Sequence, residues 1–224
     1  MSAAGETTKS PFERILFYTG SILAIAVAGF TIWDHFSKAS PPDLHISFAY
    51  SDSQLLRVLP TIDDKDPEWV YPFPLGLVVS NRGGQTASGT VMNIVHPRNL
   101  KIESLNKDVR ATHQLISSGT ERMVLTSVPL GDIHPDQTLH LDDAVYAATE
   151  NTVQMSVPIT SSDNVPGIVD VSLLVTYDIR VQVAAKDTPE RTSSLYLTVG
   201  GQEQLDKLGQ PYWEATKTEM RLHK

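Results

Sequence analysis

The chain has 224 residues and a net charge of −8, with 41% hydrophobic and 20% charged residues. This composition is typical of a globular domain and excludes a chain that is disordered throughout. The charges of residues 1–38 cancel, so the whole negative charge lies on the remainder, which would repel nucleic-acid phosphates. The absence of cysteine excludes disulfides, thiol catalysis and thiolate metal sites.

Residues 15–33 contain no charge, and as a helix they nearly match a hydrocarbon core of roughly 30 Å. We predict one transmembrane helix there, after a cytoplasmic segment at 1–14 and before a proline-terminated linker at 34–42. Lys9 and Arg14 precede the span and only Lys38 closely follows it, which favours a cytoplasmic amino terminus. The alternative is a cleaved signal peptide, but the apolar run exceeds the roughly 7 to 15 residues of a signal-peptide core.

With this orientation the body lies outside the cytoplasm. None of the six asparagines begins an Asn-x-Ser/Thr triplet, so a eukaryotic secretory route is not indicated. We therefore expect a bacterial inner-membrane protein whose body faces the periplasm. Within the span, Gly20, Ala24 and Ala28 share one side of the helix, which would allow a second helix to pack closely. The alternative is that these are the small residues common in any membrane anchor.

Beyond the linker the apolar residues recur with a period of two, as in strands that bury one face. The longest such run covers residues 169–183, and with a second run at 195–199 it predicts a long antiparallel hairpin. Shorter strands are expected at 45–50, 75–80, 90–96, 112–116, 122–127, 138–141 and 152–157. Without long amphipathic helices between them, these strands predict an all-β sandwich over 43–200. We expect a tail at 201–224 with a short helix near 202–208.

A resemblance supports this fold class. The stretch from Leu77 to Gly84, followed by Ala87 and a strand at 91–95, is similar to the opening of bacterial immunoglobulin-like domains of the CARDB type. The chain departs from that pattern at Asp136, where the family tends to have a glycine, and at 60–74, which has no counterpart. The resemblance covers less than half of the body. It implies an immunoglobulin-like antiparallel β-sandwich that serves as an adhesive or scaffolding module, with no catalytic residues.

One cluster of residues has the composition of a metal site. Asp132, His134, Asp136 and His140 lie close in sequence, and carboxylates with imidazoles are the ligands that zinc uses. Because Asp132 to Gln137 has the composition of a turn, the alternative is a solvated turn with no metal, which we favour. We therefore predict neither a metal nor another cofactor.

An aromatic segment is the other candidate site. Trp69, Tyr71 and Phe73 alternate among prolines and could form an exposed platform for a sugar or a peptide. The alternative is an edge strand whose rings cover the end of the sandwich. No Gly-x-Ser-x-Gly, His-Glu-x-x-His or phosphate-loop motif occurs, so we predict no catalytic residue.

These observations predict a non-catalytic protein-interaction or assembly module of the bacterial envelope. Its expected partners are the membrane, through one helix, and another envelope or membrane protein, or a second copy through the helix. Two alternatives remain open: a ligand- or metal-binding periplasmic module, and a membrane-tethered sensor that faces the cytosol.

Overall fold

The protein was analysed in a computed structural model, which describes residues 25–31 and most of 40–223. Outside the described residues lie 1–24, 32–39, 52, 64, 67, 105–109, 119–120, 143, 152–154, 161–165, 172, 187, 217–218 and 224, together with the side chains of 118, 121, 155–160 and 166–171. The chain forms two compact units, Met1–Ser40 and Pro41–Lys224.

The first unit contains a short helix at residues 25–31. In the part of the chain that is described, no helix is both long and apolar enough to span a membrane. Most of the predicted span at 15–33, including Gly20 and Ala24, lies outside the described residues. Ala28 lies on the described helix and is exposed.

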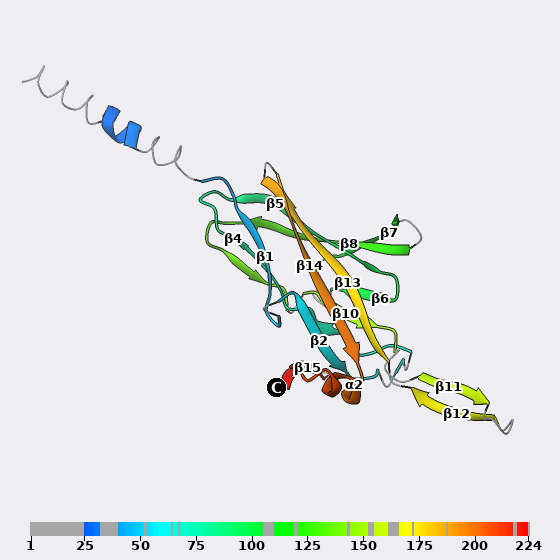
Figure 1. Cartoon of the computed structure of the whole chain (residues 1–224). Helices are drawn as coiled ribbons and strands as arrows, with labels where there is room; N and C mark the ends of the chain where they lie inside the picture. The colour runs from blue at the N-terminus through cyan, green and yellow to red at the C-terminus, as the bar shows by residue number, and fades with distance from the viewer. Residues whose placement is uncertain are drawn as a thin grey trace, which may run out of the picture. The chain divides into compact units, whose positions relative to one another are not determined.

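The second unit is built almost entirely of strands (Figure 1). Its large sheet has eight strands, in the order β16 (Met220–His223), β15 (Tyr212–Ala215), β2 (Leu55–Pro60), β14 (Thr188–Gly200), β13 (Leu174–Ala185), β5 (Ala87–Pro97), β8 (Glu121–Ile133) and β7 (Thr112–Ser118). Two smaller sheets are formed by β1 (Leu44–Phe48), β4 (Leu77–Asn81) and β9 (Thr138–His140), and by β3 (Phe73–Pro74), β10 (Tyr146–Thr149) and β6 (Leu100–Glu103).

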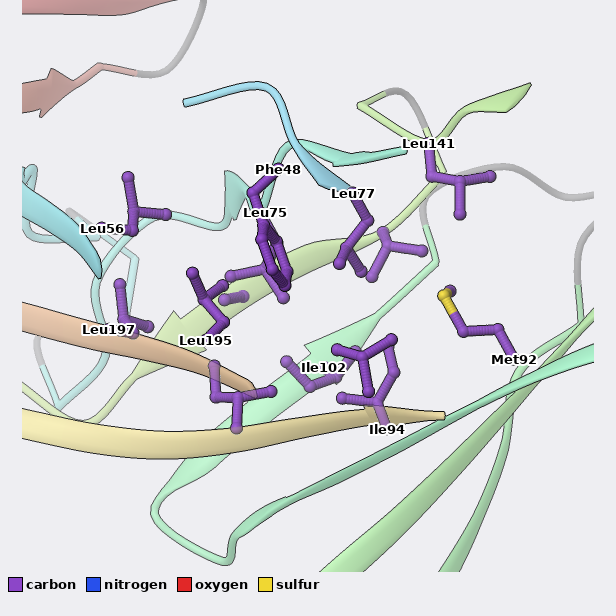
Figure 2. Packing of buried hydrophobic residues seen from close by; sticks show 14 of the residues in the cluster. Phe48, Leu56, Leu75, Leu77, Met92, Ile94, Ile102, Leu141, Leu195 and Leu197 are labelled. Carbon is purple, nitrogen blue, oxygen red and sulfur yellow. The ribbon is translucent and has the colours of Figure 1, made fainter. Parts of the chain in front are cut away.

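The smaller sheets pack on the inner face of the large sheet around one hydrophobic core. Figure 2 shows Leu75, Leu77 and Phe48 from the small-sheet side facing Leu195 and Ile94 from the large sheet. In β1, β2 and the middle of β13 the core side chains come from every second residue, as the period-two pattern requires, whereas β4 and β10 bury consecutive residues. The prediction of an all-β sandwich is therefore confirmed.

The long run at 169–183 is divided between two hairpins. Its first residues belong to β12 (Pro166–Val171), which pairs with β11 (Met155–Thr160) in a separate two-stranded sheet. The remainder is β13, which pairs with β14 as the predicted long antiparallel hairpin. Leu173 and Leu174 are exposed, so the alternation at this point does not bury them.

Two features of the large sheet differ from the sequence prediction. First, β2 runs parallel to both of its neighbours, β14 and β15. The chain passes from the small sheet at β1 to the large sheet at β2. The sandwich is therefore not purely antiparallel. Second, the sheet continues past residue 200: the helix expected there is present as α2 (Gln202–Lys207), and β15 and β16 follow it as strands of the sheet.

A buried amide joins the two layers. Asn81, fully buried at the end of β4, accepts hydrogen bonds at Oδ1 from the backbone N–H groups of Asp43 and Gly83, at 3.1 and 3.0 Å. Its Nδ2 donates to the carbonyls of Gln85, at 2.7 Å, and Ile133, at 3.0 Å. Ile133 ends β8 of the large sheet. The Asn81 side chain therefore connects the small sheet to the large sheet, and it also holds Asp43 at the start of the sandwich and the turn at Gly83.

The turn after Asn81 needs a glycine because the entering chain lies against it. A Cβ at Gly83 would lie 2.1 Å from the carbonyl oxygen of Pro41 and 2.6 Å from the amide nitrogen of Asp43. The Arg82 N–H also donates to the Asp43 carbonyl at 2.8 Å. Asn81 and Gly83, which carried part of the family resemblance, therefore fix where the chain enters the sandwich.

Polar substitution on the two faces of β13 should have opposite outcomes. Val181→Asn places an amide in the core, where an unpaired polar group costs roughly 1–3 kcal/mol in addition to the lost apolar burial, so we expect a large fall in the melting temperature. The matched change Arg180→Asn, on the exposed face, should leave the melting temperature almost unchanged. Circular dichroism melts that fall equally for both variants would contradict this register.

Asn81→Asp tests the buried amide with almost no change of shape. The two carbonyls of Gln85 and Ile133 would each lose a donor and face a carboxylate, so unfolding in urea should require about 3 kcal/mol less free energy. Asn93→Asp is the control, because Asn93 Oδ1 only accepts a bond there, from the Ser127 hydroxyl. Equal stability of the two variants would show that the Asn81 donors do not matter.

Candidate functional site

Three of the four candidate metal ligands have hydrogen-bond partners elsewhere in the fold. Asp132 Oδ1 accepts from the Gly89 N–H at 2.8 Å, where β5 is bulged against β8. His134 Nδ1 lies 3.1 Å from the Thr86 hydroxyl. Asp136 has a positive φ of 58°, and its N–H donates to the Asn81 carbonyl at 2.9 Å.

His140 lies on β9, exposed and paired with Val78 of β4. Among the residues that the structure describes, no three His, Asp or Glu side chains come together closely enough to hold a metal ion. The contact of Asp136 ties the turn to the end of β4, and that of Asp132 ties it to the bulge of β5.

The aromatic segment does not present three rings on one surface. Phe73 is only 1% exposed and belongs to the core, whereas Trp69 and Tyr71 are half-buried. The alternation breaks at Pro72, because both Val70 and Phe73 are buried. Trp69 packs under a cation, with Lys101 Nζ 3.4 Å from the centre of its ring.

Lys101 belongs to a hollow that we call the lateral groove. It has a volume of about 280 Å³ and lies between the edge strand β6 and the inner face of β5, β8 and β7. It is lined by His96, Arg98, Leu100, Lys101, Ile102, Glu103, His113 and Val124. Apolar side chains and polar groups of both signs therefore meet at one side of the sandwich.

The edge strand β7 contributes His113 to the groove. Leu115 is 69% exposed and lies opposite Val124 of β8, which in turn lies opposite His96 of β5. Leu115, Val124 and His96 therefore lie side by side on one face of the sheet, with Leu115 exposed to solvent and His96 buried. In the described part of the chain β7 pairs only with β8, so its outer edge offers backbone groups to an added strand.

The two groove histidines are joined through one buried hydroxyl. His96 Nδ1 lies 3.0 Å from the Pro97 carbonyl and must donate to it, since a carbonyl only accepts. In the neutral ring Nε2 then accepts from the Thr126 hydroxyl at 2.9 Å. The same oxygen accepts from His113 Nδ1 at 3.0 Å. The geometry thus defines a chain of hydrogen bonds from the exposed His113 to the buried His96.

Burial lowers the pKa of His96 from its ordinary value, because the charged ring would lose water. The Pro97 and Leu100 backbone groups oppose this shift, whereas the nearby His113 adds to it. His96 is only 2% exposed, so the folded chain holds it neutral near pH 7. The positive charges of the groove are then those of Arg98 and Lys101, with Arg122 next to Arg98 in the neighbouring hollow.

No pattern in the sequence indicates this groove. Its residues come from four strands and a loop, and no motif connects them. One signal was available: the strand expected at 112–116 contains no Lys, Arg, Asp, Glu or Pro, which is unusual for an edge strand.

Comparison with known proteins adds little to this description. No family model and no curated protein matches the chain. Among solved structures it is similar to a cohesin module from a family 33 glycoside hydrolase of Clostridium perfringens, with 12% identity and a TM-score of 0.33, over 73% of this chain and 99% of that module. A likeness of this size says nothing about what this chain binds.

The neutral state of His96 predicts a pH-dependent stability. The unfolded chain gains a proton at His96 near pH 6.5, whereas the folded chain gains it only at a lower pH. The His96 contribution to stability should therefore be complete above pH 6.5 and be lost as the pH falls through the folded pKa, with a slope of up to about 1.4 kcal/mol per pH unit.

Urea unfolding between pH 7.5 and 5 measures that slope. His96→Gln should reduce it, while the control His134→Gln, at an exposed turn residue, should keep the parent slope. A His96→Gln chain with the parent slope would contradict the assignment.

Proposed function

We propose that this protein is a non-catalytic interaction module of the bacterial envelope that binds an extended segment of a partner protein at the lateral groove and the β7 edge. The sandwich is of the immunoglobulin-like kind. A single helix at 15–33 anchors it in the inner membrane, with the body in the periplasm. The observation that carries the proposal is the open β7 edge, with the exposed Leu115 beside the groove.

The two edges of the large sheet differ in the way that strand addition requires. At the other edge, β16 carries Arg221 and His223, which pair with Glu219 and with Glu214. Charged side chains of this kind protect an edge against pairing with other chains. The strand β7, Thr-His-Gln-Leu-Ile-Ser-Ser, has no Lys, Arg, Asp, Glu or Pro. It is therefore the edge suited to β-augmentation, in which backbone hydrogen bonds give affinity and pockets give specificity.

The groove supplies that specificity. The half-buried Val124 and the exposed Leu115 provide apolar contacts, whereas Leu100 and Ile102 of the lining are buried in the core. Arg98 and Lys101 provide two positive charges against the one acidic residue of the lining, Glu103, on a chain whose net charge is −8. A matching segment is extended, with apolar residues alternating with acidic ones. Membrane anchoring would raise the effective concentration of the module near partners in the same membrane.

Selection from a random nine-residue peptide display library tests the proposal on the full chain in detergent. We expect enrichment of peptides with alternating apolar and acidic residues. Leu115→Asp should weaken their binding by at least about tenfold, because it removes an exposed apolar contact and repels acidic side chains.

The matched control is Leu222→Asp, which changes a leucine that is 44% exposed on the opposite edge strand, β16. It should bind the selected peptides as the parent does. The proposal fails if no peptide is enriched, or if both variants bind the selected peptides equally.

A further inference from the structure

A second hollow, which we call the end hollow, lies where β5 ends between its neighbours β13 and β8. On β13, pairing with β5 covers only Arg180 to Ala184, and β5 itself ends at Pro97. The end hollow is lined by residues 97–99, by 122–123 at the start of β8 and by 175–177 near the start of β13. Its volume of about 380 Å³ is within the range of small-molecule pockets, roughly 300–1,000 Å³.

Two arginines line the end hollow at the same level of the sheet. The last residue pair of β5 and β8 is Pro97 with Met123, so the next residues of the two segments are Arg98 and Arg122. Both are exposed, and neither guanidinium forms a hydrogen bond or an ion pair with a described residue. Like charges at opposite positions of neighbouring strands are destabilising. The fold therefore holds two cations together, and no described group neutralises either of them.

The rest of the lining suits an anion that carries an apolar group. None of the described residues that line the end hollow is Asp or Glu, although the chain has 26 of them against 18 Lys and Arg. Asn99 and Thr176 have side chains that can donate hydrogen bonds. Met123 and Val175 are half-buried and add apolar surface. A fitting ligand combines a strong negative charge with a small apolar group.

The number of charges favours a phosphate over a carboxylate. A carboxylate has one negative charge and would leave one of the two arginines uncompensated. A phosphate monoester carries a charge of about −1.5 to −2 near pH 7 and has three acceptor oxygens. The planar guanidinium of arginine binds phosphate through two parallel hydrogen bonds, so two arginines can each hold one edge of the group.

We infer that the end hollow binds a phosphate monoester, with Arg98 and Arg122 on its oxygens and Met123 and Val175 against its apolar group. Arg98 also borders the lateral groove, whereas Arg122 does not line it, so this site goes beyond the proposed peptide contact. The monoester has two possible sources, a soluble phosphate ester and the headgroup of a phosphatidate lipid.

Isothermal titration of the full chain in detergent with phenyl phosphate, at pH 7.5 and low salt, tests the site. We expect saturable binding. Arg98→Gln and Arg122→Gln should each weaken it at least about tenfold, because each change removes charge-assisted hydrogen bonds. The matched control is Arg180→Gln, at an exposed arginine of β13 outside the end hollow, which should bind phenyl phosphate as the parent does.

Two further ligands test the choice of phosphate. Methyl phenyl phosphate keeps the ring but has one charge fewer, and benzoate has a single carboxylate. Both should bind at least about tenfold more weakly than phenyl phosphate, because one charge compensates only one arginine.

Competition separates the two sources. Glycerol 3-phosphate and the water-soluble dibutanoyl phosphatidate should both displace phenyl phosphate. Tighter binding of dibutanoyl phosphatidate would assign the site to lipid headgroups, and equal displacement would assign it to soluble esters.

Melting temperatures show whether the arginines serve a ligand or the fold. Without ligand, Arg98→Gln and Arg122→Gln should melt at or slightly above the temperature of the parent, because repulsion is relieved. Phenyl phosphate should raise the melting temperature of the parent and of Arg180→Gln, but not of the other two variants.

The inference is overturned if phenyl phosphate does not bind, if benzoate binds as tightly, or if Arg180→Gln weakens binding as much as the two hollow variants do. Lower melting temperatures of both hollow variants without ligand would also overturn it, because the arginines would then stabilise the fold itself.

Discussion

The amide of Asn81 is the contact on which the arrangement of the sandwich depends. Its two acceptor bonds hold Asp43 and Gly83, and its two donor bonds hold Gln85 and Ile133. All four partners are backbone groups, and a buried backbone group without a partner costs roughly 1–3 kcal/mol. A side chain of another shape could satisfy the donors or the acceptors but not both sets, which explains why an asparagine ends β4.

The strand β8 connects this junction to the lateral groove. One end, at Ile133, bonds to Asn81, and Val124, towards the other end, lines the groove. The groove wall is therefore built on a strand that is fixed at the junction and flanked by β5 and β7. Rigid elements of this kind position a binding surface more accurately than loops do.

Electrostatics divides the groove into a neutral interior and a charged rim. Burial keeps His96 uncharged, and its bonds to Pro97 and Thr126 satisfy both ring nitrogens. The positive charge stays with the exposed Arg98 and Lys101, where it costs little desolvation before a partner arrives. An apolar segment can thus enter beside cations without burying an unpaired charge.

The sequence by itself determined the fold class, because a period of two records which face of each strand is buried. It also located the β13–β14 hairpin and the helix α2, each of which depends on neighbours in the chain. It did not determine the parallel pairing of β2 or the break between β12 and β13, since strand order depends on distant segments.

The lateral groove joins residues 96–103, 113 and 124, so only the tertiary structure could bring them together. Conversely, Trp69, Tyr71 and Phe73 have the spacing of a shared surface, but the break in alternation at Pro72 places Phe73 in the core. Local patterns fix local structure, whereas a site made of several strands is decided by how the sheets pack.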